Sequence, residues 1–554
     1  MPDSPNIPEV IPASLATRAL RLFRPSHQHT AFSATLLLMS AVMLSRVIGY
    51  VREMYIAWAF GAGALTDAYN AGFTIPDFLN YILAGGTVSI TFISIYTRFL
   101  AEKKEDEAQK TFSVIVTVMT TVLLAGIVIA EIFAPEICRW WFSGFTSEQL
   151  ALCVHLTRIL LPAQIFFYVG GVVSAVLLSR RLFLFPAFGP LLYNAFIILG
   201  GIFLSRRLGI SSLAYGALIG SFIGPFLVNA IGAARVGTGY SFSFDTKNKA
   251  FREWVRLTIP LMLGVSLVTA DDWILRHFAS SGVGVITRLN YAKRLFTVPI
   301  AILGQATGQA SLPFFARLFG EKRTQEFTEA VNGSVYRVIA AALLFTSWMM
   351  AASLPLIDLL YRRGHFVFSD SQQTATYFFL FSLSLPFWSA QALYARAFYA
   401  TGNTLTPMIA STLITLGSLP LYSALFHVYS AEGLAVASDL GIMANCLAMA
   451  ILLRQRKLVT TGQLIWSEII KAGITAVVAG VLAYAVAKHV LVNNSKRADL
   501  EALGLLTITW AAAATAGLWI TRSELPRDLL RRKSTTYPRA VELQTEELST
   551  GSEP

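Results

Sequence analysis

Long apolar runs separated by short polar segments recur along the whole chain. Each run has about 18 residues or more, which is enough for a helix to cross the hydrocarbon core of a bilayer. The pattern predicts about fourteen membrane-spanning helices, at 31–58, 66–97, 111–133, 151–178, 183–205, 211–234, 254–280, 287–317, 333–360, 373–400, 405–428, 431–453, 464–490 and 499–521. The predicted fold class is therefore an all-α polytopic membrane protein.

Composition supports this interpretation. Of the 554 residues, 55% are hydrophobic and only 14% are charged, and the mean hydropathy is +0.58. An average soluble chain has about 25% charged residues, so a soluble protein is excluded. The net charge of +12 does not indicate nucleic acid as a partner, because the basic residues gather in short loops and in the two tails. Membrane lipids are the expected surroundings.

The distribution of basic residues predicts the orientation. With the N-terminus inside, most Lys- and Arg-rich loops fall on the cytoplasmic side, as in RFLAEKKEDEAQK (98–110) and RQRK (454–457). Arg206–Arg207 and Arg362–Arg363 are exceptions on the other side. About thirty polar residues precede the first apolar run, which is long for the start of a signal peptide. We interpret residues 1–30 and 522–554 as cytoplasmic tails.

An internal repeat divides the chain. RFLAEKK (98–104) and RLFGEKR (317–323) each end a long span, and their offset is close to 219 residues. The repeat predicts two six-helix lobes around a central cavity, followed by two further helices. The expected boundaries are 31–236 for the N-lobe, 237–253 for a cytoplasmic linker, 254–457 for the C-lobe and 458–521 for spans 13 and 14. Parallel repeats of this kind are typical of alternating-access transporters.

Charged residues inside the apolar runs are concentrated in the first two spans of each repeat. A charge at the bilayer centre costs roughly 2.5–3.5 kcal/mol on insertion scales, so such residues usually face a wet cavity or a partner. These residues are Arg46, Arg52, Glu53, Asp67, Asp271, Asp272, Arg276, Arg288, Lys293 and Arg294. They predict a cavity of net positive character between the lobes. Two other interpretations stay open: charges at span ends that reach the head groups, and Asp271 and Asp272 pairing structurally with Arg276 or Arg294.

A cationic cavity favours an anionic substrate. The arginine fork donates two hydrogen bonds at once and is suited to phosphate. Glycines and prolines in these spans are candidate conformational residues, because glycine lets backbones approach and proline kinks a helix. They are Gly49, Gly85, Gly86, Pro76 and Pro299. Helix packing alone is an equal explanation for the glycines.

Motifs for catalysis are lacking in the sequence. It has no HExxH, GxSxG or Walker A pattern, so we do not expect an enzyme. The three cysteines, Cys138, Cys153 and Cys446, form no CxxC pair and no metal spacing, and we interpret them as isolated thiols.

Several motifs resemble a known family. SRVIGYVRE (45–53), FGAGALTDAYNAGFTIPDFL (60–79) and RAFYATGNTLTP (396–407) are similar to the MurJ/MviN lipid II flippases of the multidrug/oligosaccharidyl-lipid/polysaccharide exporter superfamily. PLLYN (190–194) and RRGHF (362–366) are weaker matches. The resemblance implies a flippase in the bacterial cytoplasmic membrane. Such a protein carries the undecaprenyl-pyrophosphate-linked peptidoglycan precursor, lipid II, from the inner to the outer leaflet for cell-wall synthesis.

The resemblance also implies site residues. Arg46, Arg52 and Asp67 match essential cavity residues of the family in the first two spans, and Arg294 matches its arginine in the eighth. The arginines are expected to bind the pyrophosphate and the head group. Glu53, Arg288 and Lys293 are further candidates that come from the charge pattern of this chain, and Arg288 and Lys293 are additions to the family pattern. The two C-terminal spans are expected to form a groove for the lipid tail, and cell-wall synthesis machinery is a possible partner.

The sequence departs from the family pattern at Asn80 and Gly85, where many members have a basic and an acidic residue. Some members bind sodium through an acid in the seventh span and through Asn and Asp in the eleventh. Asp271 or Asp272 matches the first of these, but the eleventh span has neither Asn nor Asp. We expect no cofactor, with a sodium ion or the membrane potential as the drive.

Three alternatives to lipid II transport stay open. A flippase for another undecaprenyl-pyrophosphate-linked saccharide would share the cationic cavity. An ion-coupled exporter of small amphipathic molecules would need fewer arginines and more aromatic lining. A membrane scaffold of a wall-synthesis complex would tolerate loss of the buried charges but not loss of the basic tails.

Overall fold

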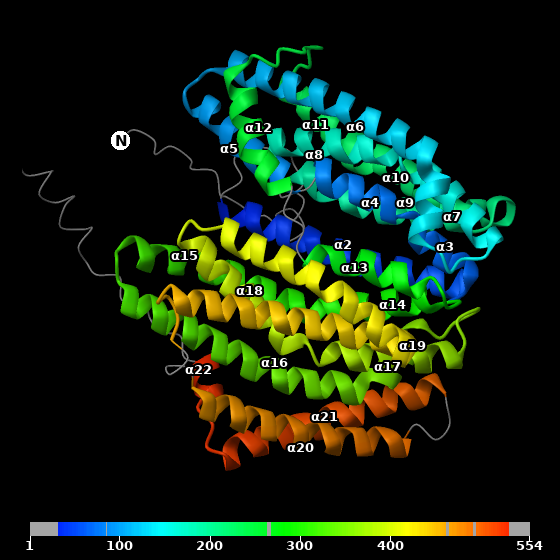
Figure 1. Cartoon of the computed structure of the whole chain (residues 1–554), viewed down its shortest axis with the longest axis vertical. Helices are drawn as coiled ribbons and strands as arrows, with labels where there is room; N and C mark the ends of the chain where they lie inside the picture. Colours follow the sequence, from blue (N-terminus) through cyan, green and yellow to red (C-terminus); the bar gives the residue numbers. More distant parts are fainter. Residues whose placement is uncertain (1–30, 85, 263–266, 461–464, 491–494, 531–554) are drawn as a thin grey trace, which may run out of the picture.

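The computed structural model describes residues 31–84, 86–262, 267–460, 465–490 and 495–530, and this part of the chain is all-helical (Figure 1). Both predicted tails, apart from 522–530, and Gly85 lie outside the described residues. The first half of the chain contains α2 (Ala31–Phe60), α3 (Ala64–Gly72), α4 (Thr74–Leu79), η1 (Asn80–Ala84), α5 (Gly86–Ala101), α6 (Glu105–Trp141), α7 (Ser147–Leu160), α8 (Ala163–Ser179), α9 (Leu184–Leu208), α10 (Ser211–Ser221), η2 (Phe222–Val228) and α11 (Asn229–Arg235).

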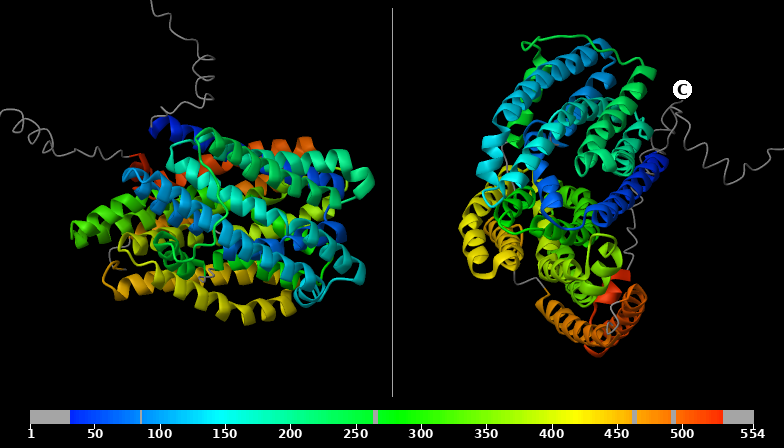
Figure 2. Two further views of the ribbon diagram at one scale, coloured as in Figure 1. Left: turned by 90° about the horizontal axis from the view of Figure 1, so that it is seen from above. Right: turned by 90° about the vertical axis from the view of Figure 1, so that its right-hand side faces the viewer.

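The second half begins with two short helices and ends with a helical pair. It contains α12 (Lys249–Met262), α13 (Leu267–Ala279), α14 (Val285–Pro299), η3 (Ile300–Ala306), α15 (Thr307–Gly320), α16 (Thr324–Tyr361), α17 (Phe368–Ser382), α18 (Leu385–Ala400), α19 (Leu405–Gln455), α20 (Trp466–Val490), α21 (Lys496–Ile520) and α22 (Leu525–Leu530). We call α2–α11 the N-lobe and α13–α19 the C-lobe. The lobes and the α20–α21 pair form successive layers, and their helices run in one general direction (Figures 1 and 2).

The predicted spans match this element order. Among the described residues, eight helices are long and apolar enough to cross a membrane, or nine when α17 and α18, bent by 45°, count as one span. The 51-residue helix α19 contains two predicted spans, since Ser430 has non-helical backbone angles at its middle. The four predicted spans that remain are the first two of each lobe. All four are rich in charge. Three of them are divided into shorter helical segments, whereas the first is the single 30-residue helix α2.

Helix breaks occur at matching places in the two lobes. In the second predicted span, Pro76 precedes the π-helical segment η1, and in the eighth, Pro299 ends α14 directly before the π-helical segment η3. Because proline lacks an amide hydrogen, it removes one bond of the α-helical ladder and favours such a break. The helix type thus changes after each of these prolines, and kinking at Pro76 and Pro299 stays a prediction.

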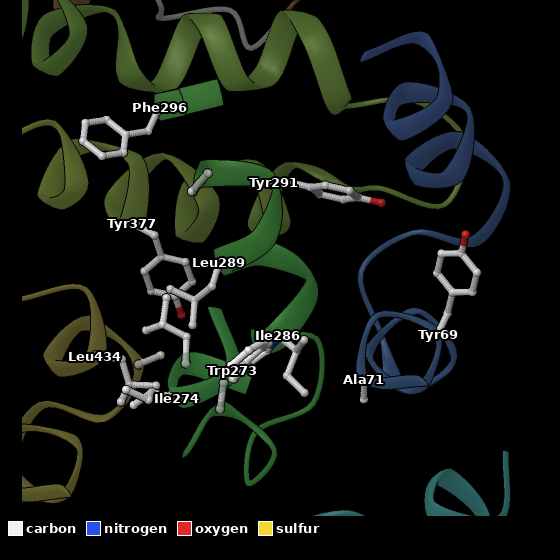
Figure 3. Packing of buried hydrophobic residues seen from close by; sticks show 14 of the residues in the cluster. Tyr69, Ala71, Trp273, Ile274, Ile286, Leu289, Tyr291, Phe296, Tyr377 and Leu434 are labelled. Atoms are coloured by element: carbon white, nitrogen blue, oxygen red, sulfur yellow. The ribbon is translucent and has the colours of Figure 1, made fainter. Parts of the chain in front are cut away.

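The apolar core differs between the two ends of the molecule. Near Phe60 and Val285, one continuous cluster joins the lobes; Figure 3 shows Tyr69 and Ala71 of the N-lobe with Ile286 and Tyr291 of the C-lobe in this cluster. At the opposite end each lobe has its own cluster, around Phe92–Trp254 and around Phe315–Val459. We call these the sealed end and the split end. Among the described residues, the two lobes therefore share an apolar core at the sealed end only.

The seventh predicted span is divided between the lobes. Its first half, α12, packs against α5 and α6 of the N-lobe, and Trp254 belongs to the N-lobe core. Its second half, α13, packs against α19 of the C-lobe. Arg98 of α5 forms a bidentate pair with Glu253 of α12, at 2.9 and 2.6 Å. The predicted boundary at residue 253 falls inside α12, and the domain limits stay a prediction.

The α20–α21 pair packs along α16 of the C-lobe. Two indole hydrogen bonds fix it there: Trp348 donates to Thr507 at 3.0 Å, and Trp510 donates to Ser347 at 2.9 Å. Most of its other side chains face outward, and Trp519 is 82% exposed. An apolar surface of this kind fits a lipid environment.

Candidate functional site

Two arginines share one buried carboxylate at the centre of the lobe interface. Arg52 and Glu53, neighbours on α2, form an ion pair of 2.5 Å, and Arg294 of α14 approaches the same Glu53 oxygen at 3.2 Å. Glu53 is only 3% exposed. Asn194 of α9 accepts a further hydrogen bond from Arg52 at 2.8 Å. The cluster carries one positive charge in excess and joins the two lobes.

Arg46 and Arg294 are the solvent-facing cations of this region. The Arg294 side chain is 46% exposed, and Arg46 is exposed. Tyr50 lies between them: its hydroxyl donates to the Arg294 carbonyl at 2.8 Å, and Arg46 lies one helical turn away on the same face of α2. Among the described residues, no hydrogen bond or ion pair holds the Arg46 guanidinium. These two groups can therefore receive an external anion.

Lys293 lies between the two candidate sodium ligands. Its ammonium group contacts Asp271, and it contacts Asp272 at 2.5 Å. Asp271 is buried and also accepts hydrogen bonds from Tyr422 and Ser438, two residues of α19. No group of three or more His, Cys, Asp and Glu residues suited to a metal ion occurs in the described ranges. In this conformation the chain supplies its own cation to the carboxylate pair.

Asp67 lies at the sealed end and is fully buried. Its carboxylate accepts hydrogen bonds from the Gly284 amide (2.5 Å), the Thr287 amide (2.8 Å) and the Thr287 hydroxyl (2.7 Å), all at the start of α14. An acid from the N-lobe thus caps a helix of the C-lobe, where free amides and the helix dipole favour negative charge. Asn70 extends the contact through Thr287 at 3.1 Å and Asn290 at 3.0 Å.

A close backbone contact completes the sealed end. The His365 amide donates to the Trp58 carbonyl at 3.1 Å. Gly364 has a φ of +55°, and an added Cβ would lie 2.2 Å from the Trp58 oxygen. Gly61 approaches His365 in the same way, with a φ of +69°. The RRGHF motif (362–366) therefore meets the end of α2, and glycine is required at both positions.

The remaining charged candidates form pairs. Arg276 of α13 contacts Asp77 of α4 at 3.3 Å and adds a further link between the lobes. Arg288 pairs with Asp370 of α17 at 2.9 Å, inside the C-lobe, and both side chains are 11% exposed. Arg288 thus does not face the open part of the interface.

The conformational candidates lie along the same helices. Gly49 faces Asn194 between α2 and α9, and Gly86 begins α5. Asn80, at the first departure from the family pattern, donates to Gln164 of α8 at 2.8 Å. The amide pair holds this position within the N-lobe.

The RAFYATGNTLTP segment (396–407) lies apart from the charged cluster, at the split end. Together with Arg456 and Phe319 it lines a cavity of about 560 Å³. Arg456 donates to Thr406 at 2.8 Å. The motif marks a turn between helices α18 and α19 rather than part of the central site.

Some residues of the site were not predicted as functional. Asn194 orients Arg52, and its signal was the PLLYN motif (190–194). Gly284 and Thr287 supply the donors that Asp67 caps, and no sequence pattern of their own pointed to them. Tyr422 and Ser438 contact Asp271 from spans 11 and 12, and no motif marks either residue.

Comparison with known proteins identifies the family of this chain. The sequence model of the family described as "Lipid II flippase MurJ" matches residues 56–494. A "Lipid II flippase MurJ" of Burkholderia cenocepacia is 27% identical over 439 residues, covering 77% of this chain and 84% of that protein. A "Probable lipid II flippase MurJ" of Rickettsia prowazekii is 26% identical over 424 residues, covering 75% and 83%.

Solved structures share the fold. One described as "Lipid II flippase MurJ, inward closed conformation" has a TM-score of 0.74 at 22% identity and covers 90% of this chain and all of its own. An inward-facing MATE-family multidrug transporter of the MOP superfamily has a TM-score of 0.63 at 15% identity, covering 76% of this chain and 97% of its own. Since the family match extends over most of the sequence, the chain belongs to the MurJ family of lipid II flippases.

Proposed function

We propose that this protein moves lipid II from the inner to the outer leaflet of the bacterial cytoplasmic membrane by alternating access. The split end faces the cytoplasm, together with both termini, and the sealed end faces outward. The basic loops at 98–110 and 454–457 support this orientation. Family membership supports the substrate. The transport cycle requires no covalent chemistry from the protein.

The exposed pair Arg46 and Arg294 carries the proposal. Arg46 lies near the middle of α2 and Arg294 lies in the second half of α14. Both side chains are exposed, so an anion entering from the cytoplasm can meet them. The pyrophosphate of lipid II replaces Glu53 as the partner of Arg294, because that contact is the longer and more exposed of the two Glu53 pairs. Arg52 stays buried beside Glu53 and Asn194 and holds the cluster together.

Outward opening must break the contacts of the sealed end. Asp67 then releases the start of α14, and His365 releases the Trp58 carbonyl. The membrane potential is a suitable drive, since each charge that crosses it is worth about 2.3 kcal/mol per 100 mV. Lys293 occupies the carboxylate pair in the state described here, so sodium is not required at Asp271 and Asp272 in this state.

Complementation tests the proposal. A bacterium depleted of its own lipid II flippase receives the wild type, Arg46→Ala or Arg294→Ala at matched expression, and outer-leaflet lipid II is measured with a leaflet-specific label. We expect rescue by the wild type and loss of at least tenfold in both variants. Arg323→Ala is the control, because Arg323 forms exposed pairs with Glu321 and Glu326 at the split end.

Each other outcome has a definite meaning. A well-expressed wild type that moves no lipid II would point to another undecaprenyl-pyrophosphate-linked saccharide, with Asn80 as the first position to examine. Full rescue by both arginine variants would show that the cationic pair does not bind the cargo. Rescue by the arginine variants together with failure of tail-deleted protein would favour a scaffold in the wall-synthesis machinery.

A further inference from the structure

Two of the three cysteines meet at the sealed end. Cys138 of α6 and Cys153 of α7 have their sulfur atoms 4.0 Å apart, and the Thr157 hydroxyl lies 3.9 Å from Cys138. The expectation of isolated thiols is wrong for this pair. We propose that Cys138 and Cys153 are joined by a disulfide bond in the mature protein, an inference that rests on the proposed outward orientation of the sealed end.

The position of the pair fits an oxidising compartment. Cys138 lies in the last turn of α6, and Cys153 lies in the second turn of α7, on either side of a short connection. In the proposed orientation this connection is on the outer side, where disulfides form and persist. Cys446 belongs instead to the C-lobe core of the split end, with no second cysteine in that cluster as described. The thiol pair and Cys446 thus lie at opposite ends of the molecule.

The geometry requires only a small adjustment. A disulfide has its sulfur atoms about 2.05 Å apart, so the two must approach by roughly 2 Å. The two sulfur atoms already contact each other, so no other group lies between them. Cys138 is 1% exposed and Cys153 is fully buried, so an oxidant cannot reach them in the folded protein. The bond therefore forms during folding, before α7 packs against α6.

The chemistry is thiol–disulfide exchange. The thiolate of one cysteine attacks the disulfide of an outer-compartment thiol oxidase and forms a mixed disulfide, and the second thiolate then displaces the oxidase sulfur. Two protons and two electrons leave the Cys138–Cys153 pair, and the oxidase disulfide is reduced to a dithiol.

The disulfide would restrain the segment between Cys138 and Cys153, which contacts the C-lobe at the sealed end. The segment enclosed between the two cysteines includes Trp141, whose indole donates to the Trp273 carbonyl at 3.4 Å and whose carbonyl contacts the His277 ring at 2.7 Å. Gly144, in the same segment, packs directly on the Ser281 backbone. The disulfide therefore fixes the loop through which the N-lobe contacts α13 and the loop that follows it.

Counting free thiols tests the proposal directly. Membranes are denatured in N-ethylmaleimide without reductant, and the adducts on the purified chain are counted by mass spectrometry. We expect one adduct on the wild type before reduction and three after reduction. Without any adduct, the mass of the unreduced chain should be lower than that of the reduced chain by two hydrogen atoms. Cys446→Ser should take none before reduction, whereas Cys138→Ser and Cys153→Ser should each take two. The wild type alone decides the question, so a poorly folded variant does not affect it.

Three adducts on unreduced wild type would overturn the disulfide. A separate measurement tests the orientation: Ser147→Cys, exposed at the start of α7, is introduced into a chain with the other cysteines replaced, and intact cells are treated with a membrane-impermeant maleimide. Labelling of Ser147→Cys together with three adducts on the wild type removes the disulfide and keeps the proposed orientation. Labelling only after lysis overturns both.

Discussion

Glu53 neutralises charge at a point where two guanidinium groups converge from different lobes. A carboxylate that is 3% exposed is stable there because Arg52 and Arg294 both contact it. Removal of one member of a buried ion pair leaves an uncompensated charge and costs about 3–5 kcal/mol. Glu53 thus has a structural role in the empty protein, and in the proposed cycle it gives up Arg294 when cargo binds.

Glu53→Gln should lower the free energy of unfolding by about 3–5 kcal/mol, because Arg52 loses its buried counter-charge. Unfolding in detergent under identical conditions measures this loss. The control is Glu326→Gln, since the exposed pair of Glu326 with Arg323 is worth at most about 1 kcal/mol. Equal losses in the two variants would contradict the structural role.

The contacts of Lys293 predict that flipping by the wild type does not depend on sodium. Because its ammonium group already contacts Asp271 and Asp272, lipid II flipping by the wild type should be the same in sodium and in choline media. Lys293→Gln leaves two neighbouring carboxylates without a counter-charge, so sodium should raise its thermal unfolding midpoint and leave that of the wild type unchanged. A wild-type flipping rate that falls without sodium would argue against this assignment.

At the residue scale, the sequence indicated which charged residues belong to the site, but it did not indicate which groups each of them contacts. Arg46, Arg52, Glu53, Lys293 and Arg294 stood out because apolar spans rarely carry charge. Which of them would be exposed depended on neighbours from distant helices, such as Asn194 beside Arg52. The thiol pair was missed because α6 and α7 bring together cysteines whose spacing matches no local motif.

At the scale of elements, Asp67 connects a helix start in one lobe to an acid in the other. The start of α14 has a glycine at its cap, with a φ of +77° and no side chain to accept its free amides. Asp67 supplies that acceptor only while the lobes are together. The cap therefore stabilises the sealed conformation and is absent from any conformation in which α3 and α14 separate.

Asp67→Asn should weaken the seal by about 0.5–2 kcal/mol, the usual worth of a helix cap. A cysteine placed at the buried residue Ser280, in an otherwise cysteine-free chain, reports opening through its rate of labelling by an impermeant maleimide. We expect this rate to rise severalfold. Asp106→Asn is the matched control, because Asp106 also lies in the first turn of a helix but is exposed at the split end. No difference between the two variants would exclude the capping role.

The hydropathy pattern predicted where the long helices lie, but it did not predict where a span is divided into separate helices. Long apolar helices such as α6 and α16 follow from length and composition alone. The division of the seventh span into α12 and α13 depends on which lobe each half contacts, and a one-dimensional pattern does not contain that information. Pro76 and Pro299 did mark the breaks that their chemistry dictates.

At the scale of the whole molecule, the seal relies on backbone contact between the end of α2 and the RRGHF turn. Gly364→Ala should keep the lobes from closing, since its Cβ would lie 2.2 Å from the Trp58 oxygen. Spin labels at Glu148→Cys and Ser369→Cys, one on each lobe, should show a longer distance in this variant. Gly402→Ala is the control: its φ is +75°, and nothing lies within 4 Å of its added Cβ. An unchanged distance in Gly364→Ala would contradict the contact.

The two-lobe plan could be predicted from the repeat and from the concentration of charge in four spans. The closure of one end could not, because it depends on Asp67, Gly364 and Trp58 meeting groups more than two hundred residues away. Charge patterning shows which spans carry polar groups, but it indicates neither which of these groups are buried in pairs nor which of several conformations a chain adopts.

The unequal division of the apolar core has a consequence for the idle protein. The lobes share a core at the sealed end only, as far as the chain is described, so in the proposed orientation this conformation has its entrance toward the compartment where lipid II is made. Bound cargo must offset the loss of the contacts at the sealed end before that end opens. Such a resting state keeps the membrane impermeable between turnovers and ties the pace of export to the supply of precursor.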